Sequence, residues 1–232
     1  MKFKDILYSA LFLPTLASAG AIDDPLLSMV MIDQLEIRST DGPDPLVLDG
    51  QLWIGKDLNK LWIKAEIERV DGETEEAELQ ALYSRAVAPF WDVQVGWRRD
   101  FIPKPERDWL AVGVQGLAPY FFEVDAALFI GEGGRTAARI EAEYEFMFTQ
   151  RLVLSPEIEM NFYGKDDPAV GIGSGLSDIE AGLRLRYEYR REIAPYIGIN
   201  WTRKFGQTAD YARAAGEDIK DTQIVAGIRL WF

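Results

Sequence analysis

The stretch KLWIKAEIE, residues 60–68, alternates apolar and polar side chains with a period of two. In an extended strand, residues two apart share a face, so this pattern predicts a β-strand whose two faces differ in chemistry. The same alternation recurs in residues 138–146 and 178–188. In the first stretch, the apolar face consists of Leu61, Ile63, Ala65 and Ile67.

Alternating stretches of this kind fill most of the chain. We expect strands near residues 29–38, 46–54, 59–69, 75–85, 90–101, 109–118, 120–131, 136–147, 152–163, 177–189, 194–205 and 222–232. Short connections between the predicted strands alternate with longer ones, and the longest are 164–176 and 206–221. Membrane barrels show this pattern, with short periplasmic turns and long external loops. The sequence therefore predicts an all-β fold, a transmembrane antiparallel up-and-down β-barrel of about 12 strands.

A soluble β-sandwich or a lipocalin-like barrel shows the same alternation but turns its apolar face inward. Two features favour an apolar exterior for this chain. The predicted apolar faces carry no charge except Asp33, and lipid penalises a charge at the bilayer midplane by about 2–4 kcal/mol. Trp91 and Trp97 lie towards opposite ends of one apolar face, where aromatic girdles border a membrane.

The N-terminus has the features of a secretory signal peptide. Lys2 and Lys4 precede the apolar stretch 6–16, and the Ala-Ser-Ala sequence at 17–19 fits the cleavage rule. The alternative is a buried N-terminal helix. No later segment has the roughly 18 uninterrupted apolar residues of a transmembrane helix. The predicted parts are a signal peptide at 1–19, a short periplasmic segment at 20–28 and an outer-membrane β-barrel at 29–232.

The C-terminus has a second export feature. The chain ends in an aromatic residue, Phe232, and apolar residues precede it at alternate positions. This ending resembles the C-terminal signal that the barrel assembly machinery of Gram-negative bacteria recognises. We therefore expect the protein to lie in the bacterial outer membrane, with two kinds of partner: the barrel assembly machinery, through Phe232, and outer-membrane lipid.

Composition excludes several functions. The net charge is -13, with 38 acidic and 25 basic residues, which argues against binding nucleic acid. The chain contains no Cys and no His, so it has no thiolate and lacks the usual general base near neutral pH. The glycines of 171–175 lack the Lys-Ser/Thr of a P-loop. We therefore expect that the protein is not an enzyme.

The polar faces predict an acidic barrel interior. If the hairpins close at 132–135 and 148–151, Glu143 faces both Glu123 and Glu157, and Glu141 faces both Asp125 and Glu159. Opposed carboxylates in a narrow space need an arginine from across the barrel, raised pKa values or a bound cation, so one interpretation is a metal site. The candidate metal ligands are Glu123, Asp125, Glu141, Glu143, Glu157 and Glu159.

The alternative is a charge network with Arg98, Arg184 and Arg186 that plugs the barrel. Carboxylates alone are hard ligands that favour Ca²⁺ or Mg²⁺ over Cu(I). Met29 and Met31 have the spacing of thioether copper ligands, but the strand phase turns Met31 towards lipid, so we interpret them as membrane-facing side chains.

Four motifs suggest a family. They are GVQGLAPY (113–120), YGKDDP (163–168), GIGSGLSD (171–178) and REIAPYIG (191–198). Together with the strands around them, residues 29–232 resemble the copper resistance protein B family of outer-membrane barrels. Many members carry a Met- and His-rich segment between signal peptide and barrel. Here that segment is absent, because only about nine residues separate the predicted cleavage site from the first predicted strand.

The resemblance implies an outer-membrane protein of copper homeostasis and resistance that binds or passes copper ions. It implies a copper ion as the ligand and a periplasmic multicopper oxidase as a partner. The alternative function is a closed structural or general-diffusion barrel without metal chemistry.

Overall fold

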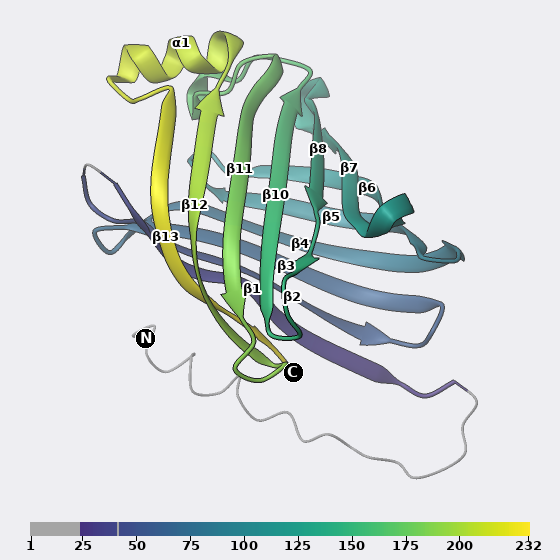
Figure 1. Cartoon of the computed structure of the whole chain (residues 1–232). Coiled ribbons are helices and arrows are strands. Elements are labelled where there is room, and N and C mark those ends of the chain that lie inside the picture. The colour runs from purple at the N-terminus through teal and green to yellow at the C-terminus, as the bar shows by residue number, and fades with distance from the viewer. Residues whose placement is uncertain (1–23, 41) are drawn as a thin grey trace, which may run out of the picture.

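The fold is one antiparallel sheet that closes on itself (Figure 1). This computed structural model describes residues 24–40 and 42–232, so the predicted signal peptide lies outside the described residues. Neighbouring strands along the chain pair with each other, and the first strand pairs with the last. Closure leaves no open edge, which a sheet in lipid requires because hydrocarbon offers no hydrogen-bond partner to a free backbone group.

The strand bounds match the predicted ones to within a few residues. The strands are β1 (Leu27–Ser39), β2 (Leu46–Gly55), β3 (Asn59–Val70), β4 (Glu73–Ala88), β5 (Trp91–Ile102), β6 (Arg107–Ala118), β7 (Phe122–Gly131), β8 (Thr136–Glu143), β9 (Phe146–Met147), β10 (Leu152–Tyr163), β11 (Gly175–Tyr187), β12 (Ile193–Lys204) and β13 (Lys220–Trp231). Because β8 and β9 both pair with β10 and together make one interrupted strand, twelve strands surround the interior.

The break between β8 and β9 corrects the single strand predicted at 136–147. It lies at Tyr144, opposite Pro156 of β10, and a proline has no N–H to donate to the ladder. The Tyr144 N–H still donates to the Pro156 carbonyl at 3.0 Å. The Tyr144 ring packs against two aromatic rings, with centroid distances of 4.9 Å to Phe122 and 4.4 Å to Phe146.

The connection predicted as a loop at 206–221 contains a helix, α1 (Gly206–Ala215). Its alanines favour the helix, and Gly216 ends it in the left-handed conformation, with φ of 81°. α1 lies at the end of the barrel opposite the C-terminus (Figure 1). We call the α1 end the outer end and the C-terminal end, which has the short turns, the inner end. In the described part of the chain, no helix is long and apolar enough to cross a membrane.

The phase of β1 changes at a β-bulge. The pairing registers shift between Ile32 and Leu35, and the extra residue turns Asp33 inward. Asp33 accepts a hydrogen bond from Gln51 at 2.7 Å, so its predicted place on the apolar face is wrong. The same bulge corrects the predicted orientation of Met31, which lines the interior instead of facing lipid.

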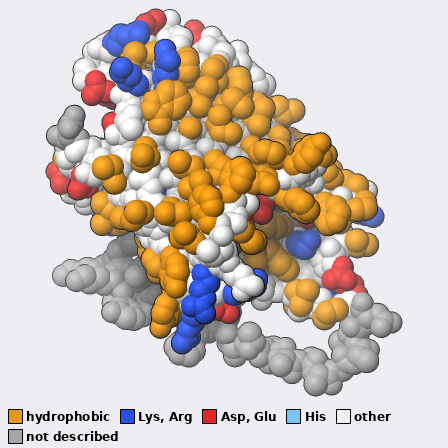
Figure 2. Space-filling view, viewed as in Figure 1, with side chains coloured by type: hydrophobic (Ala, Val, Ile, Leu, Met, Phe, Trp, Pro, Cys, Tyr) orange, Lys and Arg blue, Asp and Glu red, His pale blue; other side chains and the backbone are white. Residues whose placement is uncertain are grey.

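The apolar faces point outward, as predicted. Leu128 and Ile197 are 62% and 64% exposed, whereas Arg184 and Glu36 inside the barrel are 4% and 1% exposed. A band of hydrophobic side chains covers the visible face of the barrel wall (Figure 2). This inside-out distribution of charge suits a hydrocarbon environment and not water.

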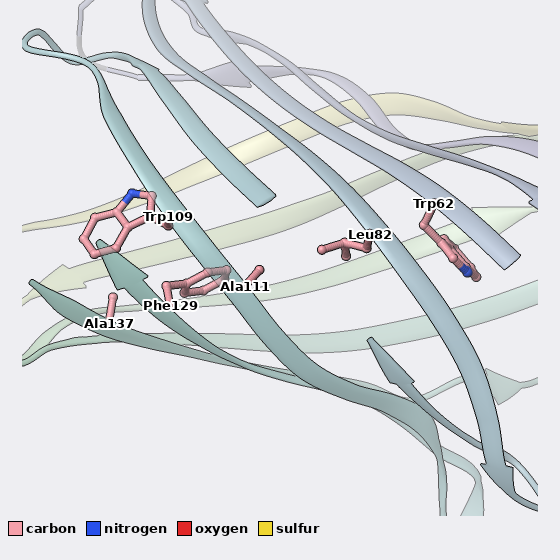
Figure 3. Close-up of a cluster of buried hydrophobic side chains, with 6 residues drawn as sticks. All are labelled: Trp62, Leu82, Trp109, Ala111, Phe129 and Ala137. Carbon is pink, nitrogen blue, oxygen red and sulfur yellow. The ribbon is translucent and has the colours of Figure 1, made fainter. Parts of the chain in front are cut away.

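The interior also contains a buried apolar cluster (Figure 3). The residues of this cluster are Trp62, Leu82, Trp109, Ala111, Phe129 and Ala137. Near the outer end, the indole N–H of Trp109 donates to Asp100 at 2.8 Å, and the guanidinium carbon of Arg98 lies 4.5 Å from the centroid of the Phe129 ring. Aromatic and charged side chains therefore fill this end of the barrel together.

An apolar exterior predicts depth-dependent costs of added charge. Ile199 lies on the outward face halfway along β12, and Leu61 lies on the outward face near the inner end of β3. We expect Ile199→Lys to lower the free energy of unfolding in lipid vesicles by about 2–4 kcal/mol, and the control Leu61→Lys by about 1 kcal/mol or less. Chemical denaturation of the refolded barrel measures both, and equal costs at the two depths would contradict the membrane orientation.

Candidate cation site in the barrel interior

An acidic cavity of about 490 Å³ occupies the middle and the inner part of the barrel. Among the described residues, eleven Asp and Glu side chains line it but only six Lys and Arg. As predicted, the interior therefore carries an excess of negative charge. In a space walled by protein and surrounded by lipid, such an excess attracts cations, because walls of low dielectric constant focus the field of the charges.

The predicted carboxylate pairs are in register. Glu143 lies opposite both Glu123 and Glu157, and Glu141 lies opposite both Asp125 and Glu159. All six predicted ligands line the same cavity. Within the ranges 24–40 and 42–232, however, no three Asp or Glu side chains converge closely enough to hold a metal ion.

Basic partners neutralise most of these six carboxylates. The ion-pair distances are 3.1 Å for Glu157–Arg184, 3.3 Å for Glu143–Arg186, 3.3 Å for Glu159–Arg139 and 4.0 Å for Glu141–Arg139, and Asp125 pairs with Lys64. Among the described side chains, Glu123 forms no ion pair, nor does Asp49 on the neighbouring cavity wall. The cavity thus keeps carboxylates that a bound cation could neutralise.

Glu36 is the centre of a buried network that joins distant strands. Its two carboxylate oxygens accept hydrogen bonds from Arg184 of β11, each at 2.9 Å. Arg38 and the hydroxyl of Tyr196 donate to the same carboxylate, also at 2.9 Å each. Gly227 makes room for the contact, because a Cβ atom there would lie 2.6 Å from the Tyr196 hydroxyl. Four donors to one carboxylate make this pairing rigid.

A second network surrounds Glu78 nearer the outer end. Arg98 and Arg139 approach the same carboxylate oxygen of Glu78 at 2.8 Å and 2.9 Å, and Gln80 donates to the other oxygen at 2.6 Å. Arg98 also pairs with Asp100 at 2.7 Å. Glu78 and Arg139 line the cavity together with Phe129 of the apolar cluster.

A third network contains the residues that the bulge of β1 turns inward. Arg229 of β13 pairs with Asp33 at 3.4 Å and with Glu145 at 3.3 Å. The same guanidinium lies 3.5 Å from the sulfur of Met31, and Arg186 also pairs with Glu145. Each arginine of the predicted plugging network, Arg98, Arg184 and Arg186, therefore lies in an ion-paired cluster.

The outer mouth is crossed by the connection between β10 and β11. Asp167 of this connection accepts hydrogen bonds from Arg107 of β6 at 2.8 Å and 3.0 Å and pairs with Arg135 at 2.8 Å. Nearby, the backbone N–H of Ser174 donates to Asp166 at 2.6 Å and lowers the pKa of that carboxyl.

α1 is attached to the same connection. Thr208 of α1 accepts the Gly173 N–H at 2.9 Å, and its hydroxyl lies 3.0 Å from that of Ser177. The outer end of the barrel is thus covered by loops that are bonded to each other and to the wall.

Sequence analysis missed Glu36, Arg38, Asp33 and Met31 as interior residues. The alternation of Gln34, Glu36 and Arg38 is a period-two signal that could have identified two of them. The bulge that reorients the other two has no comparable signal, because one extra residue in a strand leaves the composition unchanged.

The closed barrel, its apolar exterior and its charged interior define an outer-membrane β-barrel protein. Solved structures share the fold: the NanC porin has a TM-score of 0.58 at 12% identity, over 88% of this chain and 99% of that chain. Outer membrane phospholipase A from Escherichia coli has a TM-score of 0.51 at 12% identity, over 88% and 92% of the two chains. At such identities the likeness extends to the fold alone.

Sequence comparison is more specific. The family described as Copper resistance protein B precursor matches residues 26–232. The copper resistance protein B homolog of Pseudomonas syringae pv. tomato is 48% identical over 210 residues, which cover 90% of this chain and 71% of the relative. Copper resistance protein B of Escherichia coli is 48% identical over 215 residues, 91% of this chain and 72% of the relative. The chain therefore belongs to the copper resistance protein B family and is an outer-membrane protein.

Removal of a buried arginine tests the interior network. We expect Arg184→Met to lower the free energy of unfolding by about 3–5 kcal/mol, because Glu36 and Glu157 then lose a buried partner. As a control, Arg213→Met breaks an exposed ion pair with Asp210 and is expected to cost no more than about 1 kcal/mol. Unfolding of both variants in vesicles gives the comparison, and a small effect at Arg184 would show that the network is not structural.

Proposed function

We propose that this protein contributes to copper resistance by binding copper ions in the acidic cavity of the barrel. The observation that carries the proposal is the excess of carboxylates over basic groups in that cavity, within a family named for copper resistance. The proposed copper ligands come from the six predicted carboxylates, Glu123, Asp125, Glu141, Glu143, Glu157 and Glu159.

Two chemical arguments support copper over other cations. For a given set of oxygen and nitrogen ligands, Cu²⁺ binds more tightly than the other divalent ions of the first transition row. The thioether of Met31 also faces the cavity and supplies one soft donor, which suits Cu(I). Met29 lies two residues earlier on the same strand, before the bulge, and so on the same face.

The second candidate is a closed structural barrel without metal chemistry. It is favoured by the guanidinium groups that occupy much of the interior and by the loops held at Asp167 across the outer mouth. If copper enters the cavity, the same features favour binding of the ion over its free passage through the barrel. An ion that left the cavity outward would meet the Glu78 network first.

We also propose two partners. The C-terminal Phe232 is 68% exposed and its N–H pairs with Val30, so its ring is available on the barrel exterior to the barrel assembly machinery. A periplasmic multicopper oxidase is the partner that the family resemblance implies, and the cavity's extension towards the inner end supports exchange of copper on the periplasmic side.

Copper titration of the refolded barrel tests the site. We expect the quadruple variant E141Q/E143Q/E157Q/E159Q to bind Cu²⁺ at least about tenfold more weakly than the wild type, a loss of about 1.4 kcal/mol. The control E73Q/E75Q/E132Q/E192Q removes the same charge from exposed positions and should bind like the wild type. Circular dichroism checks that the variants fold, and equal affinity of the wild type and the first variant would favour the closed barrel without metal chemistry.

Growth of bacteria tests the cellular role. We expect a strain that lacks the protein to grow less well than its parent in copper and equally well in zinc or silver, because copper is the metal that the family name specifies. The wild-type gene should restore growth, and the quadruple cavity variant should not. Equal growth of the deletion strain and its parent in copper would contradict the copper proposal and leave the fold unaffected.

A further inference from the structure

Two basic side chains lie directly opposite each other on the lipid-facing wall at the outer end. Arg203 of β12 pairs in register with Lys220 of β13, and both side chains are exposed. Both belong to the outward face, since they continue the alternation that places Ile199 and Ile224 towards lipid. Like charges in directly opposed positions destabilise a sheet unless an anion lies between them.

Neither side chain has an acidic partner in the part of the chain that the structure describes. Their neighbours do: Lys204 pairs with Glu217 at 2.7 Å, and Arg213 pairs with Asp210 at 2.7 Å.

The acids adjacent to Lys220 do not neutralise it. Asp221 binds the side chain of Gln223 at 2.9 Å, and Asp218 forms no ion pair with either Arg203 or Lys220 within the described ranges. The guanidinium carbon of Arg203 lies 5.0 Å from the centroid of the Phe205 ring, which restricts its position. A positive pair without a counter-charge is unusual in a chain whose net charge is -13.

The aromatic and apolar residues next to Arg203 indicate the depth of the basic pair in the membrane. Trp201 precedes Arg203 on the same face of β12, and the apolar band of Ile197 and Ile199 continues towards the inner end. Aromatic residues at the end of an apolar band mark the depth of the lipid headgroups. Figure 2 shows basic and acidic side chains at the α1 end, beyond the hydrophobic band. Arg203 and Lys220 therefore lie where the headgroups of the outer leaflet begin.

We propose that Arg203 and Lys220 form a binding site for a phosphate group of an outer-leaflet lipid. A guanidinium provides two parallel N–H donors to a phosphate and an ammonium adds a point charge, so the two residue types complement each other. The lipid's acyl chains would lie on the apolar wall formed by β12 and β13, below its phosphate. Bound phosphate would remove the repulsion between the two basic groups.

Native mass spectrometry of the detergent-solubilised full chain tests this site, with phosphatidic acid as the probe and phosphatidylcholine as the zwitterionic comparison. We expect the wild type to retain phosphatidic acid and R203Q/K220Q to bind it at least about tenfold more weakly. The control R69Q changes another outward-facing arginine at the outer end, one that donates to the Gly72 carbonyl, and should bind like the wild type.

Two further measurements distinguish lipid phosphate from free phosphate, and the lipid proposal from the copper proposal. If inorganic phosphate displaces the lipid at equal concentration, the site recognises free phosphate and the lipid assignment is overturned. Equal retention of phosphatidic acid by the wild type and R203Q/K220Q overturns the site itself. Copper titration of R203Q/K220Q should match the wild type, since these residues lie outside the cavity. Failure of this proposal is thus distinct from failure of the copper proposal.

Discussion

Charged groups are excluded from hydrocarbon, and this exclusion explains both the closure of the sheet and the contents of its interior. A sheet in lipid must close so that every backbone group is paired, and its charged side chains must then turn towards the barrel axis. In a narrow interior these charged groups lie close together, so acidic and basic side chains must pair. Glu36 is the most fully paired example, because its carboxylate accepts four hydrogen bonds.

Pairing in this barrel is extensive but incomplete. Three clusters, around Glu36, Glu78 and Arg229, stiffen the wall and occupy much of the interior. The acids nevertheless outnumber the bases around the cavity, and Glu123 and Asp49 have no ion-pair partner among the described residues. Protonation or a bound cation can offset the remaining negative charge, and the second possibility connects the physics of the barrel with a family named for copper resistance.

The two ends of the barrel differ in how closely they are covered. At the outer end, Asp167 is held by Arg107 and Arg135, and α1 is bonded to the same connection. Towards the inner end the cavity reaches Leu117 and Glu123, near the turn between β6 and β7. These contacts support the proposed binding of cations in the cavity over the passage of ions through an open pore.

The fold class, most strand bounds and the register of the opposed carboxylates could be predicted from the sequence, because a period of two assigns faces and a short connection determines which residues meet. It could not determine the orientation of Asp33 and Met31, since a one-residue bulge inverts a face without changing the pattern on either side. Nor could it identify the contact between Glu36 and Arg184, which are 148 residues apart. Only closure of the barrel turns the inner faces of these two strands towards the same interior. Which side chains then meet across the interior depends on their length and geometry, which local periodicity does not encode.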